Sequence, residues 1–202
     1  MKYSILILLL SVSVIISTAC NSHSDEHMND HQQTESVDQH NHREHESSNQ
    51  SENQPLSPDR MAMSDVGNTH VHIEYSAPSV REREIWGELV PFDGIWVTGA
   101  HMATSIQFMN DLLFDGNPIP AGKYALFTIP GEEEWTVILN ENWNQHLTDE
   151  YDPELDVLRF EVTPQENEFT EQLTFVVHGG LETGSVEFMW ENVKFSFSVE
   201  EQ

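Results

Sequence analysis

Over residues 56–202, short alternating apolar runs recur between clusters of Gly, Pro, Asn and Asp. In THVHIEY, residues 69–75, the apolar side chains Val71, Ile73 and Tyr75 occupy every second position. A period of two predicts a strand with one buried face. Eight or nine such runs follow one another, and no segment shows a long helical period. The pattern predicts one all-β domain, an antiparallel β-sandwich or a jelly-roll-like fold.

Turn residues divide this domain into its individual elements. The other strands are expected at 94–99, 103–110, 123–130, 135–140, 156–162, 170–178, 184–190 and 193–200. FDGNPIPAGK at 114–123 is typical of a hairpin connection, the pair at 191–192 of a hairpin turn, and 141–153 of a polar loop. The pattern suggests a helix of one or two turns only at REREIWGEL, residues 81–89.

The N-terminus has the layout of a secretory signal peptide over residues 1–19, with one lysine, an apolar run and then small residues. The sequence STAC at 17–20 resembles a bacterial lipobox, although Ser17 stands where Leu is common. We therefore expect Cys20, the only cysteine, to carry a lipid. That lipid would anchor the mature protein to a membrane of the bacterial cell envelope, either in the periplasm or at the surface. The alternative is an ordinary signal peptide with an incidental cysteine.

Residues 20–55 are predicted to form a disordered tether, because after the cysteine they contain no Phe, Trp, Tyr, Leu or Ile that could build a core. The tether is rich in acidic residues and holds six histidines: His23, His27, His31, His40, His42 and His45. Neutral imidazoles bind Zn and Cu, so metal capture is one hypothesis for this segment. The other is a soluble spacer that binds metal only when metal is abundant.

The charge of the chain restricts its partners. Eight Lys and Arg residues stand against 35 Asp and Glu residues, which gives a formal net charge of −27. Such a chain repels phosphate backbones, so a nucleic-acid partner is not expected. Anionic lipid head groups are repelled too, which leaves the acyl anchor as the expected membrane contact. A protein or glycan partner stays open.

Two stretches carry a family resemblance: SAPSVREREIWGELVPFDGIWVTGAHMAT at 76–104 and IPAGKYALFTIPGEEEWTVILN at 119–140. They resemble a bacterial family known only as domain of unknown function 2911. The resemblance implies an exported or envelope β-rich domain, and it implies no reaction. The family often has Arg, Asn and Glu where this chain has Val97, His101 and Met102. A family role that depends on that Arg or Glu is therefore in doubt in this protein.

Histidines of the domain suggest a metal site. Three imidazoles around an open position suit Zn or Cu, and the hypothesis names His72, His101 and His146, with His70 as a weaker candidate. Met102 could add a thioether for copper, but it points away from His101 if both are extended. The alternative is that each histidine is an ordinary solvated or hydrogen-bonded side chain.

Other chemistry has less support in the sequence. No nucleophile elbow, phosphate-binding glycine loop or HExxH helix is present. We therefore expect a non-enzymatic binding protein, with an unrecognised hydrolase as one alternative. A second alternative is a β-sandwich module for carbohydrate or peptide, in which Trp143 of the polar loop stacks on the ligand.

Overall fold

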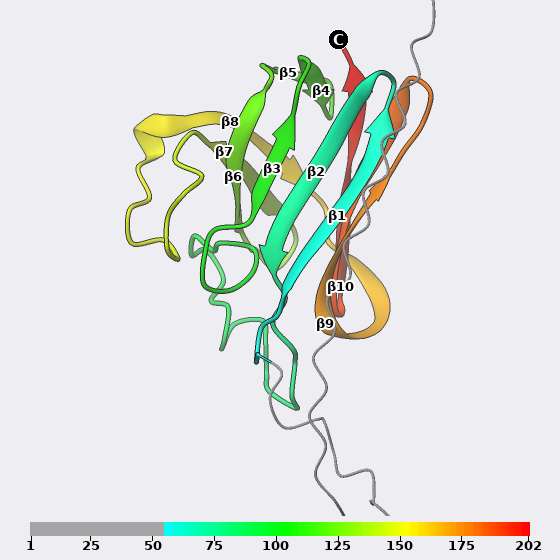
Figure 1. Cartoon of the computed structure of the whole chain (residues 1–202). Helices are drawn as coiled ribbons and strands as arrows, with labels where there is room; N and C mark the ends of the chain where they lie inside the picture. Colours follow the sequence, from blue (N-terminus) through cyan, green and yellow to red (C-terminus); the bar gives the residue numbers. More distant parts are fainter. Residues whose placement is uncertain (1–54) are drawn as a thin grey trace, which may run out of the picture. The chain divides into compact units, whose positions relative to one another are not determined.

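A computed structural model describes residues 55–202, and the predicted signal peptide, Cys20 and the six tether histidines lie outside these residues. Within the described part of the chain, ten strands form two antiparallel sheets, which confirms the predicted all-β sandwich (Figure 1). The six-stranded sheet has the order β1 (Asp59–Val66), β2 (Thr69–Ser76), β3 (Ser105–Phe108), β6 (Gly122–Ile129), β7 (Trp135–Asn140), β8 (Asp156–Val162). The four-stranded sheet has the order β5 (Asn117–Ile119), β4 (Leu112–Phe114), β10 (Thr183–Glu201), β9 (Gln165–His178).

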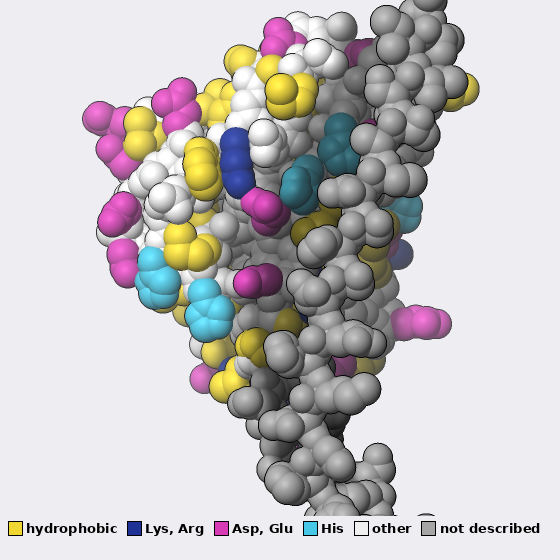
Figure 2. All heavy atoms as spheres, in the orientation of Figure 1, with side chains coloured by type: hydrophobic (Ala, Val, Ile, Leu, Met, Phe, Trp, Pro, Cys, Tyr) yellow, Lys and Arg dark blue, Asp and Glu magenta, His cyan; other side chains and the backbone are white. Residues whose placement is uncertain are grey.

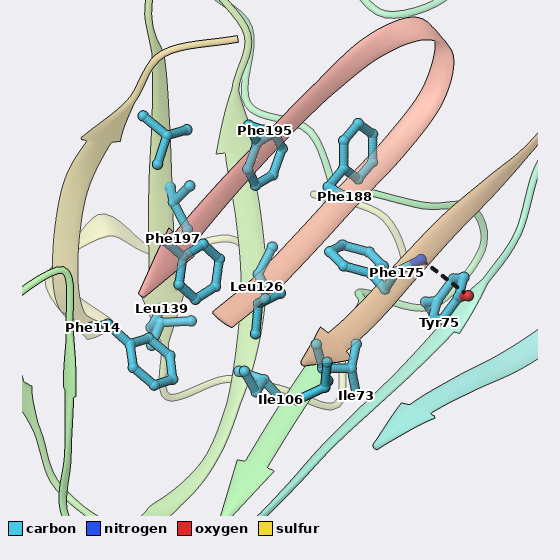
Figure 3. Close-up of a cluster of buried hydrophobic side chains, with 14 of the residues drawn as sticks. Ile73, Tyr75, Ile106, Phe114, Leu126, Leu139, Phe175, Phe188, Phe195 and Phe197 are labelled. Carbon is cyan, nitrogen blue, oxygen red and sulfur yellow. Dashed lines mark hydrogen bonds between the residues drawn. The ribbon is translucent and has the colours of Figure 1, made fainter. Parts of the chain in front are cut away.

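The core lies between the sheets and is built from alternate residues of most strands. In β2 the inward residues are the three apolar side chains that the alternation predicts, and all are buried. Figure 3 shows that Ile73 and Ile106 of the six-stranded sheet lie in one cluster with Phe175 of β9. The hydroxyl of Tyr75 accepts a hydrogen bond from the backbone N–H of Phe175 at 3.2 Å, so a polar contact also joins the two sheets (Figure 3).

The predicted hairpin turn at 191–192 is wrong, because β10 is one continuous strand with β-bulges at this point. Glu191 has a φ of 55°, and the pairing with β9 shifts register on both sides of it. The bulge changes the alternation: Phe188 is buried before it and Phe195 after it, at positions of opposite parity. Their rings stack at 4.8 Å across the bulge. An extra residue in one strand is what makes this change of parity possible.

The predicted helix at 81–89 and the predicted strand at 94–99 are also absent from the structure. Arg81 and Glu82 have left-handed φ values of 51° and 57°, which prevents a helix from starting there. The segment instead forms turns that insert Ile85 into the core. At 94–99 only an isolated bridge from Trp96 to Thr128 forms.

The outer face of the six-stranded sheet carries a second, smaller core. Val97 and Ala103 of one loop pack there against Phe127 of β6 and Ile138 of β7. The polar loop after β7 ends in a single 3₁₀ turn, Pro153–Leu155, and covers the same side through Tyr151. On the outward side of β1, Met61 and Met63 remain largely exposed. Residues 55–202 contain no helix that could span a lipid bilayer.

Candidate functional site

Methionines of β1 lie opposite polar residues of β2 on the outer face of the six-stranded sheet. Met63 is paired with His72, and Met61 is paired with Glu74. Directly opposite residues of an antiparallel pair have Cβ atoms about 4.5–5.5 Å apart, and diagonal neighbours remain within reach of long side chains. His72 therefore has Met63 opposite it and Met61 on its diagonal. Both methionines are largely exposed, at 61% for Met61 and 46% for Met63.

Two histidines stand side by side on this face because they are two residues apart on β2. The ring centroids of His70 and His72 are 6.3 Å apart. Nδ1 of His70 donates to Oδ1 of Asp65 at 2.7 Å, which fixes that ring and leaves its Nε2 as the second nitrogen. Nε2 of His72 is buried and has no hydrogen-bond partner among the described residues. We call the surface of Met61, Met63, His70 and His72 the methionine–histidine face.

A groove of about 560 Å³ adjoins this face. We call it the outer groove; Met61, Glu74, Met102, Ser105, Lys123 and Trp143 are among its lining residues. Nζ of Lys123 donates to Oε2 of Glu74 at 2.7 Å and lies 4.4 Å from the ring centroid of Trp143. Figure 2 shows hydrophobic side chains around a basic and an acidic side chain on this side of the domain. The groove thus combines apolar walls with one ion pair.

The Lys123–Glu74 ion pair is one charged element of the groove, whose lining also includes Asp59 and Arg60. The hydrogen bond from Lys123 lowers the pKa of Glu74 below its usual value, and this effect exceeds the opposing effect of partial burial. Glu74 is therefore ionised at neutral pH. Because the Glu74 side chain is 48% exposed, water screens the pair and the pair adds little to stability.

His101 and His146, the two other histidines of the predicted metal site, lie in segments that are joined by backbone contacts. Met102 forms an isolated bridge with His146, and the backbone N–H of Leu147 donates to the carbonyl of His101 at 2.7 Å. Met102 lines the outer groove, whereas His101 lines a different cavity, so the two neighbours face different spaces. Nδ1 of His146 lies 3.5 Å from Oδ2 of Asp149.

Within 55–202 no three His, Cys, Asp or Glu side chains are gathered in a group that could hold a metal ion. Figure 2 shows histidine side chains at separate places on the visible face and not in one cluster. His178 pairs with Glu187 at 2.9 Å. The structure thus brings His101 near His146 in the backbone and His72 near His70, while the arrangement of all three predicted ligands around one ion stays a prediction.

Sequence reasoning missed Met61 and Met63. The signal was present: a Met-x-Met sequence and a His-x-His sequence stand on either side of the short link Gly67-Asn68. If both runs are strands of one hairpin, a period of two places all four side chains on one face. The run at 59–66 was not recognised as a strand because only its last residue, Val66, is buried.

Residues 57–199 match the model of a family described as "Protein of unknown function (DUF2911)". The match spans nearly the whole sandwich, from just before β1 to within two residues of the end of β10, and agrees with the resemblance seen in the sequence. Comparison with curated proteins and with solved structures gave no match.

Proposed function

This chain belongs to the DUF2911 family, whose description names no activity, and from the residues of the chain itself we propose that it is an envelope lipoprotein with a non-enzymatic role in binding a transition metal. The metal is copper, held as Cu(I) at the methionine–histidine face, and Zn is the weaker ligand. The tether histidines collect metal ions and the folded domain holds them.

The observation that carries the proposal is the pairing of Met63 with His72, whose buried Nε2 has no described hydrogen-bond partner. A buried ring nitrogen without a partner costs free energy, and a metal ion would satisfy it. Thioether sulfur is a soft ligand that selects Cu(I), whereas imidazole binds both copper and zinc. A site with Met61 and Met63 beside His72 therefore favours Cu(I) over the harder Zn²⁺.

The pair of His70 and Asp65 supports the same reading. A metal-binding histidine commonly donates its second ring N–H to a carboxylate, which fixes its tautomer and orientation. The 2.7 Å contact between Nδ1 of His70 and Asp65 is such an arrangement, and it leaves Nε2 for a metal. The net charge of −27 adds a general attraction for cations around the site.

The test is a competition titration of the mature chain, residues 20–202 with Cys20→Ser in place of the lipidated cysteine. Cu(I) is delivered with a chromophoric chelator, and Zn²⁺ is titrated in a parallel experiment. Met63→Leu and His72→Asn should each weaken Cu(I) binding by about tenfold or more, the cost of removing one metal ligand or its support. Met109→Leu is the matched control, because this methionine is 71% exposed and lies outside the outer groove.

A second variant separates the contribution of the tether to metal binding from that of the domain. Replacing all six tether histidines with glutamine should reduce the number of weakly bound ions and leave one tight Cu(I) ion per chain. If this variant loses all Cu(I) binding, or if Met63→Leu and His72→Asn bind like the wild type, the metal site of the domain is refuted.

The second candidate function is recognition of a carbohydrate or peptide in the outer groove. The observation in its favour is Trp143, which is 41% exposed and lines a groove of about 560 Å³. Lys123 occupies a position over this ring, so a ligand would stack on the remaining face. This candidate predicts binding that does not depend on metal and is lost with Trp143.

A further inference from the structure

A second cavity, of about 440 Å³, lies where the turns after β2 meet the loop before β3. It is separate from the outer groove, because the two cavities share no lining residue. We call it the tryptophan cavity; its lining includes Arg81, Arg83, Leu89, Trp96, His101 and Trp190. Its volume lies within the range of small-molecule sites, about 300–1,000 Å³.

Trp190 lines this cavity and carries a hydrogen-bond donor that has no described partner. Its side chain is 1% exposed, and Nε1 has no hydrogen-bond partner among the residues that the structure describes. The neighbouring indoles are satisfied: Nε1 of Trp86 donates to Glu191 at 3.0 Å, and Nε1 of Trp96 donates to the carbonyl of Gly99 at 3.2 Å. An indole N–H can only donate, so the missing partner is an acceptor.

Two arginines bring positive charge to the same cavity in a chain that has only eight Lys and Arg residues. Arg81 donates through Nη2 to the carbonyl of Leu56, and Arg83 donates through Nε and Nη2 to carbonyls of the preceding turn. These contacts use only some of the five N–H groups of each guanidinium, so other N–H groups remain for a ligand. Neither guanidinium forms an ion pair with a described residue.

Strained backbone surrounds the cavity as well. Three of its lining residues have left-handed φ values: Arg81 at 51°, His101 at 61° and Leu147 at 49°. Such conformations cost free energy in residues other than glycine and tend to cluster at binding sites. Two of these three residues, Arg81 and His101, have side chains that carry or can carry a positive charge.

We propose that the tryptophan cavity binds a small carboxylate with a planar apolar body. The carboxylate accepts hydrogen bonds from Nε1 of Trp190 and from the free N–H groups of the two arginines. The apolar body packs against Trp96 and Leu89. A carboxylate matches the planar arrangement of guanidinium donors, and the apolar wall adds the remaining affinity. This site is independent of the proposed metal site.

The probe is benzoate, with benzamide as its neutral partner of the same shape. Both are titrated into the mature chain in the presence of a metal chelator and followed by nitrogen–proton correlation spectra of the indole groups. Benzoate should shift the Nε1–H signal of Trp190 at millimolar concentration. Benzamide should bind about tenfold more weakly, because it has no negative charge to pair with the arginines.

Two variants test the donors separately. Arg81→Gln and Trp190→Phe should each weaken benzoate binding by about tenfold, the loss expected for one hydrogen bond to a charged group. Lys194→Gln in β10 removes a positive charge outside the cavity and should leave binding unchanged. Arg81→Gln alone decides the question if Trp190→Phe fails to fold. Equal binding of benzoate and benzamide, or an unmoved Trp190 signal at saturation, overturns the proposal.

Discussion

Met63 of β1 lies directly opposite His72 of β2, on the face of the hairpin that points away from the core. The arrangement follows from one register, in which Val66 pairs with Thr69 across the tight link. A slip by one residue would turn the methionines or the histidines to the opposite face. The buried side chains of β2 fix that register. The stability of the core thus also determines which residues meet on the outer face.

The first prediction concerns pH. A metal-binding imidazole must be neutral, and a free imidazole takes up a proton near pH ~6.5, whereas a thioether does not titrate in this range. From pH ~7.5 to pH ~5.5 we therefore expect the affinity for Zn²⁺ to fall by at least about tenfold. The affinity for Cu(I) should fall less, because Met61 and Met63 remain available. Competition titrations at both pH values measure the difference.

His178→Asn is the control for this experiment, since that histidine pairs with Glu187 on the other sheet. It should leave both metal affinities and their pH dependence unchanged, whereas His70→Asn should lower them at neutral pH. Equal losses of Cu(I) and Zn²⁺ affinity in mild acid would contradict a role for the methionines.

The second prediction separates the two candidate functions. Trp143→Ala removes the exposed ring of the outer groove, and a glycan or peptide that stacks on it should bind about tenfold more weakly. Cu(I) binding should not change, because Trp143 is not part of the methionine–histidine face. An array screen followed by calorimetry on the best hit provides the measurement. A hit that Trp143→Ala leaves unaffected does not bind in this groove.

The third prediction uses the pair of Glu74 and Lys123. Because the folded state lowers the pKa of Glu74, the carboxylate contributes stability above its unfolded pKa, and this contribution is lost as pH falls through the folded pKa. The half-exposed pair limits its size to about 0.5 kcal/mol. Glu74→Gln should therefore be less stable than the wild type at neutral pH and equally stable in strong acid. Urea unfolding at a series of pH values tests this.

Glu88→Gln is the matched control, because Glu88 is exposed and forms no salt bridge with a described residue. Its free energy of unfolding should follow that of the wild type throughout the acid range. If Glu74→Gln shows the same pH dependence as the wild type, the ion pair does not exist in solution.

The sheet could be predicted from the sequence where alternation is regular. THVHIEY and WTVILN are strands because each has a clear buried face, and the structure places them in β2 and β7. Alternation failed in β10, since the bulge at Glu191 changes the buried parity and one strand then resembles two strands with a turn. The local sequence does not encode whether an Asn or Glu at such a point is a bulge or a turn. Pairing with β9 decides it.

The candidate site was only partly predictable for a related reason. His72 and Trp143 could be named from the sequence because their residue types suggest chemistry. Met61 and Met63 were missed because β1 has almost no buried face, so the strand that aligns them with His72 left no apolar pattern. The tryptophan cavity could not be predicted at all, because it depends on left-handed turns at Arg81 and in other loops.

The last prediction concerns the polar loop that carries Trp143. Burial, and then the hydrogen bond to the carboxylate of Asp156, raise the pKa of Tyr151 to about 12. A raised pKa means that the folded state favours the neutral phenol. The resulting stability is present below the unfolded pKa of about 10 and is lost as pH rises through the folded pKa. Tyr151 also accepts from Arg159 at 2.6 Å and packs edge-on against Phe127 at 5.2 Å. Ionisation of Tyr151 at alkaline pH should therefore loosen this loop.

Tyr151→Phe keeps the ring contact and removes the group that titrates. An alkaline titration followed by phenolate absorbance should lose its most basic step in this variant, while the steps of the other tyrosines remain. The variant should be less stable than the wild type by about 1 kcal/mol at neutral pH, the usual cost of lost hydrogen bonds. This difference should shrink as pH approaches 12, because ionisation of Tyr151 removes the same bond in the wild type. A wild-type chain whose tyrosines all ionise near pH ~10 would contradict the packing of the loop onto β6 and β8.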